Sequence, residues 1–176
     1  MTVLTDAQRT VIGRELGPRP TPYPVNIAMA RFWCEMVEDP NPIYFDEGYA
    51  RSTWLNGTFA PPPMLVAWRL YPVWPEVSRE SPLDWLNLPD CPATIAVNAV
   101  QEYFMPVRYG DELTFTSKVV SLSEEKTTWL GTGHFVSIMD TFHNQHGQDI
   151  GTHTFNLFVY APLEQGTGNM DQGERR

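Results

Sequence analysis

Apolar residues recur at two different spacings along the chain, and the change between them divides it into a helical part and a strand part. In the first part, Ile27, Ala30, Cys34 and Val37 lie three or four residues apart, which is the spacing of one face of an α-helix. Asn26 precedes them and is a good helix cap. The pattern predicts a helix that begins after Asn26 and ends before the Asp39-Pro40-Asn41-Pro42 sequence, where two prolines forbid continuation.

Two more helical segments are predicted before the spacing changes. A short one includes residues 46–54. The next covers residues 64–71 and is apolar on nearly every side except at Arg69, which is typical of a buried helix. Residues 72–92 are rich in proline, tryptophan and acidic side chains, and we expect them to form an ordered excursion bordering a binding site.

From Thr94 onward the apolar residues alternate with polar ones, which predicts strands. Four long strands are expected, near residues 94–103, 113–119, 129–142 and 150–160, with turns between them. Because the connections are short, the simplest arrangement makes successive strands antiparallel neighbours. The sequence therefore predicts an α+β domain.

The two ends of the chain differ from this central part. Residues 1–25 are expected to form an N-terminal arm, since the prolines between Gly17 and Pro24 impose an extended linker. Residues 26–162 make up the predicted domain. Residues 163–176 are poor in apolar side chains and are expected to be a disordered tail.

Composition and charge exclude several classes of function. A formal net charge of −9 without a basic cluster argues against nucleic-acid binding and against anionic lipid. The sequence contains no apolar run long enough to span a membrane and no signal peptide, so a cytoplasmic location is expected. Cys34 and Cys91 have no metal-ligand spacing, and no metal or organic cofactor is predicted.

One motif makes the prediction specific. Residues 38–46 read Glu-Asp-Pro-Asn-Pro-Ile-Tyr-Phe-Asp, which resembles the Asp-x-Asn-Pro-x-His-x-Asp signature of MaoC-like, (R)-specific enoyl-CoA hydratases. The matching residues are Asp39, Asn41, Pro42 and Asp46. Tyr44 stands where that family has its histidine. The run at residues 102–113 also resembles the family's strand-turn-strand, and the proline-rich segments are similar to the FAS1-like dehydratase N-terminal branch.

The resemblance implies a hotdog fold, in which an antiparallel sheet wraps around a central helix, and hydration of trans-2-enoyl thioesters. It assigns catalytic positions to Asp39, Asn41 and Tyr44. It assigns substrate binding to Met64 and Leu65, whose amides can face the thioester, and to Trp68, which can line an acyl tunnel. Since a phenol has a pKa near 10, it is a poor base at neutral pH.

Three functions remain open at this point. The leading one is a catalytically degenerate, substrate-tunnel subunit of an enoyl-CoA hydratase or dehydratase in lipid or steroid side-chain metabolism, paired with a second MaoC-like hotdog subunit. The alternatives are a self-sufficient homodimeric hydratase that uses Asp39 with Tyr44, and a non-enzymatic acyl-thioester binding protein. The strand residues His134 and His153 are interpreted as structural, and His143 and His146 as surface residues. The acyl chain, and the choice between CoA and acyl carrier protein, stay undetermined.

Overall fold

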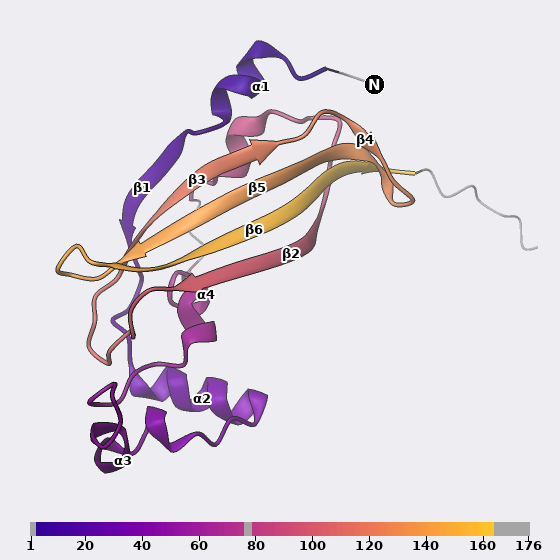
Figure 1. The fold of residues 1–176 in the computed structure, drawn as a ribbon. Coiled ribbons are helices and arrows are strands. Elements are labelled where there is room, and N and C mark those ends of the chain that lie inside the picture. Colours follow the sequence, from indigo (N-terminus) through magenta and orange to yellow (C-terminus); the bar gives the residue numbers. More distant parts are fainter. Residues whose placement is uncertain (1–2, 76–78, 164–176) are drawn as a thin grey trace, which may run out of the picture.

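A six-stranded antiparallel sheet forms the centre of the computed structural model, which describes residues 3–75 and 79–163. Its strands follow the order β1-β3-β5-β6-β2, and β4 pairs with β5 (Figure 1). The strands are β1 (Glu15–Pro20), β2 (Ala93–Tyr103), β3 (Thr114–Leu122), β4 (Lys126–Thr127), β5 (Gly131–His143) and β6 (Asp149–Pro162). The four long strands expected from the alternating pattern are all present.

The position of β2 differs from the expectation that successive strands are neighbours. β2 pairs with β6 at the far side of the sheet, and β3 pairs with β5 and β1 instead. The connection explains the difference, because residues 104–113 contain Pro106 and the Tyr109-Gly110 turn and are too long for a tight hairpin. They cross from one side of the sheet to the other.

The predicted N-terminal arm contributes to the sheet. Its residues Glu15–Pro20 form β1, an edge strand that pairs with β3. Gly17 has a φ of +129°, and a Cβ there would lie 2.8 Å from the carbonyl oxygen of Phe115, so only glycine fits. Pro18 and Pro20 lie in the same strand, where their missing N–H groups cost nothing on an unpaired edge. The predicted tail covers residues 163–176, and all of it after Leu163 lies outside the described residues.

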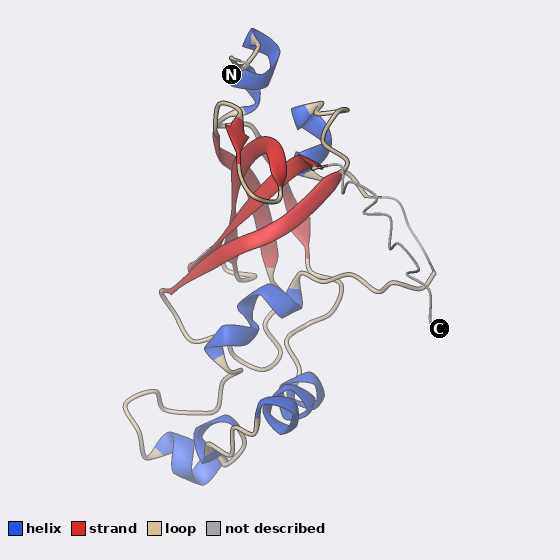
Figure 2. Ribbon diagram, turned by 90° about the vertical axis from the view of Figure 1, so that its right-hand side faces the viewer, coloured by secondary structure: helices blue, strands red, loops and turns tan. Residues whose placement is uncertain are grey.

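Helices lie at both ends of the sheet, most of them at one end (Figures 1 and 2). They are α1 (Asp6–Val11), α2 (Ile27–Val37), α3 (Glu47–Arg51) and α4 (Leu65–Trp68), with 3-10 turns η1 (Pro42–Tyr44), η2 (Pro62–Met64) and η3 (Pro82–Leu86). The helix predicted after Asn26 is confirmed, since the Asn26 side chain accepts from the Met29 amide and α2 ends at Glu38 with a φ of 57°. α3 confirms the second helical segment. We call α2, η1 and α3 the helical lobe.

The apolar face of α2 is wider than the part of it that this chain buries. Ala30 and Cys34 are buried, but Phe32 and Met36 are 73% and 74% exposed, and Ile27 is 41% exposed. The helical lobe projects away from the sheet, and within residues 3–75 and 79–163 no second layer covers this face (Figure 2). An exposed apolar face of this kind marks an interaction surface.

The central helix is shorter than the apolar run at residues 64–71 predicts. Only Leu65–Trp68 are helical, one turn that follows the 3-10 turn η2. α4 therefore covers one end of the core-bearing face of the sheet, while η3 and α1 cover the other. The sheet curls around a short helix rather than a long one.

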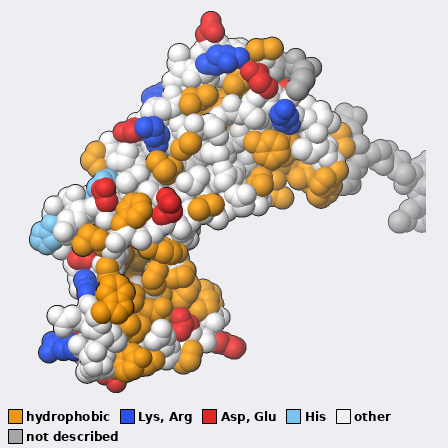
Figure 3. Space-filling model, in the orientation of Figure 1, with side chains coloured by type: hydrophobic (Ala, Val, Ile, Leu, Met, Phe, Trp, Pro, Cys, Tyr) orange, Lys and Arg blue, Asp and Glu red, His pale blue; other side chains and the backbone are white. Residues whose placement is uncertain are grey.

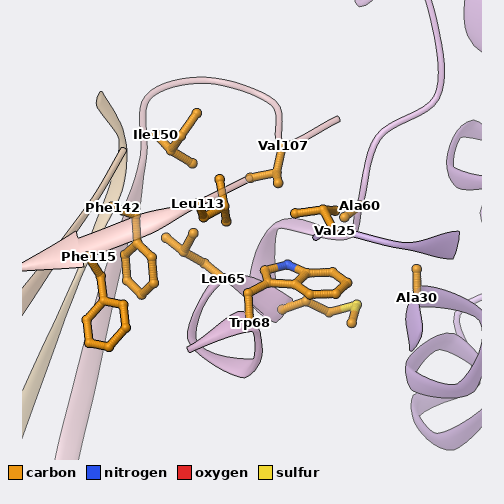
Figure 4. Packing of buried hydrophobic residues seen from close by; sticks show 11 residues of the cluster. Val25, Ala30, Ala60, Leu65, Trp68, Val107, Leu113, Phe115, Phe142 and Ile150 are labelled. Carbon is orange, nitrogen blue, oxygen red and sulfur yellow. The ribbon is translucent and has the colours of Figure 1, made fainter. Parts of the chain in front are cut away.

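The core has two parts, one under each cover. The larger cluster joins α4 and the helical lobe to the sheet, with Leu65 lying between Phe142 and Trp68 (Figure 4). In the second cluster, Leu86 of η3 packs with β3, β5 and β6 residues such as Val119 and Val136. Both clusters use alternate residues of the same strands, which places them on one face of the sheet.

Candidate functional site

The three polar residues of the motif shape the loop between α2 and α3. Asp39 Oδ1 accepts a hydrogen bond from the Asn41 amide at 3.1 Å, and Asn41 Oδ1 accepts from the Ile43 amide at 3.2 Å. Asp46 Oδ1 accepts from the Tyr49 amide at 2.9 Å and caps α3. Each side chain thus satisfies a backbone donor in a turn, as Asp and Asn commonly do.

Tyr44 lies inside the helical lobe and not on its surface. It is 8% exposed and makes edge contacts with the rings of Phe59 and Phe45, at centroid distances of 5.5 and 6.1 Å. Burial raises the pKa of the Tyr44 phenol above 10.0, and the negative charges of Asp39 and Cys34 raise it further. At neutral pH the side chain at the histidine position is therefore ionised even less often than a free phenol, so almost no phenolate is present to act as a base.

A cavity of about 420 Å³ opens beside Asp39. Its wall includes Arg31 and Cys34 together with the carboxylates of Glu35, Glu38 and Asp39. Asn41, by contrast, is exposed and does not line this cavity. The structure therefore brings Asp39 close to Tyr44, leaves Asn41 outside, and makes the surroundings acidic.

The three predicted substrate-binding residues are all core residues. Met64, Leu65 and Trp68 are 2%, 1% and 2% exposed. The Met64 amide donates to the Pro61 carbonyl at 3.0 Å, and the Leu65 amide donates to the Pro62 carbonyl. Since prolines have no N–H, the start of this helix offers no free amide at residues 61–65 to hold a thioester carbonyl. Substrate contact by these side chains stays a prediction.

A separate apolar cavity lies between the loop that follows α3 and the end of β2, and sequence reasoning missed most of it. Its volume is about 250 Å³, and its wall includes Trp54, Phe59, Phe104, Met105 and Ile150. Hydrophobic side chains gather in the bend between the sheet and the helical lobe (Figure 3). The apolar run that follows β2 was the available signal, but periodicity could not show that it faces the loop after α3.

Arg108, in the connection between β2 and β3, binds the loop that contains Trp54. Its guanidinium donates to the carbonyl oxygens of Gly57 at 2.7 Å and Thr58 at 3.1 Å, and to that of Leu55. Charged hydrogen bonds of this kind are stronger than neutral ones. The wall of the apolar cavity is thereby held in place by a residue outside it.

Residues 10–153, which are most of the chain, match the protein family described as FAS1-like, dehydratase domain region. The chain belongs to this family. Among curated relatives, the probable enoyl-CoA hydratase alpha subunit of Thermomonospora curvata is 31% identical over 159 residues, covering 86% of this chain and 50% of the relative. The 3-oxo-4,17-pregnadiene-20-carboxyl-CoA hydratase alpha subunit of Mycobacterium tuberculosis is 29% identical, covering 92% and 54%. The chain thus spans about half the length of these relatives.

Solved structures confirm the hotdog fold of this FAS1-like dehydratase region. A chain of the ChsH1-ChsH2 complex from Mycobacterium tuberculosis matches with a TM-score of 0.82 at 23% identity, covering 90% of this chain and 96% of that one. The MaoC-like dehydratase from Rhodospirillum rubrum matches with a TM-score of 0.61 at 19% identity, covering 85% and 92%. At these identities the likeness concerns the fold.

The histidines of the FAS1-like domain lie away from the motif. His134 Nδ1 is 2.9 Å from the Ser123 carbonyl oxygen, and His143 Nε2 is 3.0 Å from Asp149 in the β5–β6 hairpin. In the described residues no group of three or more His, Cys, Asp or Glu side chains has metal-binding geometry. No helix in the described part of the chain has the length and hydropathy needed to cross a membrane.

Tyr109 is expected to make the free energy of unfolding of the chain depend on pH. Its hydroxyl donates to the Tyr44 carbonyl at 3.0 Å, and burial raises its pKa from 10.0 to about 12. Because the folded pKa is the higher one, the folded state holds this proton more tightly, so the stabilisation is complete below pH 10 and is lost as the pH rises toward 12. We expect Tyr109→Phe to flatten the fall in the free energy of unfolding over this window, as measured by urea titrations at several pH values. An unchanged slope would contradict the assignment.

Proposed function

We propose that this chain is the substrate-holding, catalytically degenerate subunit of an enoyl-CoA hydratase or dehydratase, and that a second MaoC-like hotdog subunit supplies the proton chemistry. Membership of the FAS1-like dehydratase family and the hydratase names of the relatives support the reaction class. The burial of Tyr44 at the histidine position is the observation that supports assigning the proton chemistry to the second subunit.

The hydration of a trans-2-enoyl thioester sets three requirements. A base must activate water for attack on the β-carbon, an acid must protonate the α-carbon, and a donor must stabilise the enolate oxygen. A phenol with a pKa of 10 or more is ionised in about one molecule in a thousand at neutral pH, which is too few for a base. The Met64 and Leu65 amides already donate to proline carbonyls. Of the three groups, this chain retains Asp39.

What the chain does offer is a wall for the acyl group. The apolar cavity beside Trp54 and Phe104 opens toward the end of β2, where a second subunit is expected. An apolar wall of this kind fits a fatty or ring-containing acyl chain of a CoA thioester. Acyl groups from lipid or steroid side chains belong to the same proposal, in line with the steroid-acyl name of one relative.

The partner is expected to dock on the free edge of β2. Within the described residues, β2 has β6 as its one neighbour, so its outer N–H and C=O groups are unpaired. Val97 and Val100 on this strand are 49% and 55% exposed, and Phe104 just beyond it is 54% exposed. A second hotdog sheet that adds its own edge strand would satisfy these groups and cover these side chains.

A single charge on this edge is expected to break the assembly. Val100→Lys places an ammonium group where the partner sheet would pack, and burying an unpaired charge is costly. We expect the mixed complex to dissociate on size-exclusion chromatography, while the free energy of unfolding of the chain changes by about 0.5 kcal/mol or less. Val120→Lys, at a valine 44% exposed on β3, is the matched control and should leave the complex intact. Equal effects of both substitutions would place the interface elsewhere.

The proposal is tested by purifying the chain alone and together with the hotdog protein encoded beside it. Each fraction is assigned a mass and assayed for hydration of crotonyl-CoA and longer enoyl-CoA thioesters. Activity confined to the mixed complex supports the proposal. Hydration by the isolated chain at ordinary enzymatic rates would overturn it in favour of a homodimer that uses Asp39 with Tyr44.

A cytoplasmic location belongs to the same proposal. It is supported by the free thiols of Cys34 and Cys91, since reduced cysteines are typical of the cytoplasm.

A further inference from the structure

Two walls face each other across the apolar cavity, and they come from distant parts of the sequence. One wall is the loop after α3, which supplies Trp54 and Phe59. The other is the segment at residues 103–107, at the end of β2 and just beyond it. A backbone hydrogen bond joins the walls where the loop ends, from the Ala60 amide to the Val107 carbonyl at 2.8 Å. The part of the loop that contains Trp54 lies before this bond, so its position depends on other contacts.

This loop turns three carbonyl oxygens toward one point. Asn56 and Gly57 have φ values of 51° and 136°, a conformation that reverses the direction of the backbone. The Gly57 amide faces α3, where it donates to the Ala50 carbonyl at 3.3 Å. The carbonyl oxygens of Leu55, Gly57 and Thr58 accept hydrogen bonds from a single side chain. Converging carbonyl oxygens of this kind need several N–H donors at once.

Arg108 supplies those donors from the opposite wall. Its backbone continues the segment at residues 103–107, while its guanidinium reaches across to the loop, at 2.7 Å from the Gly57 oxygen and 3.1 Å from the Thr58 oxygen. A planar guanidinium holds its five N–H groups in a fixed arrangement, so it can bind several oxygens together. The Arg108 amide is itself fixed, because it donates to Asp111 Oδ2 at 2.7 Å. One side chain thus connects the two walls.

We propose that Arg108 determines how well the chain binds long acyl groups, by holding the Trp54 loop against the segment at residues 103–107. The inference rests on the proposed function, in which this cavity contacts the acyl group, and adds a positioning residue to it. Arg108 does not line the cavity and so acts through the loop. Without its hydrogen bonds the loop is free to move, and Trp54, which is 89% exposed, no longer closes one side. Methylene groups bound there then lose apolar contact and meet water.

A polar cavity on the other side of the guanidinium makes this site accessible to small molecules. Its volume is about 320 Å³, and its wall includes Glu47, Gly57, Thr58, Arg108 and Tyr109. The Glu47 carboxylate, which accepts from the Thr58 hydroxyl at 3.1 Å, attracts cations to this cavity. A small guanidinium compound in solution can therefore reach the loop carbonyls when the Arg108 side chain is shortened.

The test compares octanoyl-CoA with butyryl-CoA, which are saturated and unreactive and differ only in acyl length. Their binding to the full chain, alone and in the mixed complex, is measured by titration calorimetry. A buried methylene contributes about fourfold in affinity, so the unaltered protein should prefer octanoyl-CoA by at least about tenfold. Arg108→Ala should lower the affinity for octanoyl-CoA about tenfold and that for butyryl-CoA less than about twofold, because the butyryl group extends only one carbon beyond the reacting bond. No preference in the unaltered protein, or equal losses for both thioesters in the variant, would overturn the inference.

Further variants separate positioning from a general loss of structure. Arg108→Lys keeps the charge without the planar fork and should lose at least about threefold in affinity for octanoyl-CoA. It carries the same test if Arg108→Ala does not fold, and an unchanged octanoyl preference in it would refute the inference. Arg51→Ala is the matched control, because Arg51 pairs with Glu47 at 2.7 Å on the exposed side of α3, and it should keep the full preference. Methylguanidinium chloride should restore the preference in Arg108→Ala, and an equal effect on Arg51→Ala would contradict the assignment.

The two proposals fail separately. Hydration of crotonyl-CoA by the unaltered mixed complex reports on the proposed function alone. If the complex hydrates crotonyl-CoA and Arg108→Ala binds both saturated thioesters as the unaltered protein does, the role of Arg108 is rejected and the hydratase is kept. If Arg108→Ala selectively loses octanoyl-CoA but no complex hydrates crotonyl-CoA, the hydratase is rejected and the role of Arg108 in acyl binding is kept.

Discussion

Replacing the histidine of the partner's motif by alanine should lower enoyl-CoA hydration by the mixed complex by about 10²–10⁴-fold, whereas Tyr44→Phe in this chain should lower it less than about twofold. The large loss is the usual contribution of a general acid–base group. The small one follows from the position of Tyr44, whose ring packs against Phe45 and Phe59 inside the helical lobe. Phenylalanine keeps these contacts and removes the hydroxyl alone.

The measurement is kcat/KM for crotonyl-CoA with each variant complex, at equal occupancy confirmed by mass. A loss of more than tenfold in Tyr44→Phe would show that the phenol takes part in the reaction and would favour the reading in which Asp39 and Tyr44 work together. Tyr44→His is an informative companion. It should not create a second active site, because the Met64 and Leu65 amides are already used and the three prolines before them have no N–H.

The second large effect concerns stability. Arg69→Met should lower the free energy of unfolding by about 3–5 kcal/mol, since it leaves the Asp140 carboxylate buried without its cation. Asp140 is 2% exposed and lies 3.1 Å from Arg69 Nε, and the uncharged hydroxyl of Ser117, which donates to it, does not neutralise it. The quantity to measure is the midpoint of urea unfolding followed by circular dichroism.

The double variant Arg69→Met/Asp140→Leu separates charge from packing. It removes both ions together, so we expect it to recover most of the stability that Arg69→Met loses. If the double variant is as unstable as the single one, the loss arises from the packing of the Arg69 stem and the ion pair contributes little.

The sequence predicted the elements of this fold well because their signals are local. The start of α2 is marked by Asn26 and its end by Asp39-Pro40, and each signal involves one or two residues. The alternation in β3 and β5 reflects a single buried face. The motif residues also lie together in one loop, as their spacing required. Their observed hydrogen bonds to Asn41, Ile43 and Tyr49 amides are equally local.

Features that depend on distant pairing escaped prediction. The placement of β2 beside β6 depends on how residues 104–113 cross the sheet, which no period reveals. The length of α4 is set by the sheet beneath it, so an apolar run of eight residues became one helical turn. The clustering of three buried polar residues could not be predicted either, because Ser117, Asp140 and His153 are neighbours only through strand register.

The two prolines of β1 have a consequence for how large an assembly can become. Pro18 and Pro20 remove hydrogen-bond donors from the outer edge opposite β2, so the sheet can be extended from one side only. Two subunits that join through their β2 edges would each present a proline-bearing strand at the ends of the combined sheet. Such a pair is closed to further strand addition, and the joining of sheets stops at two instead of continuing into a fibre.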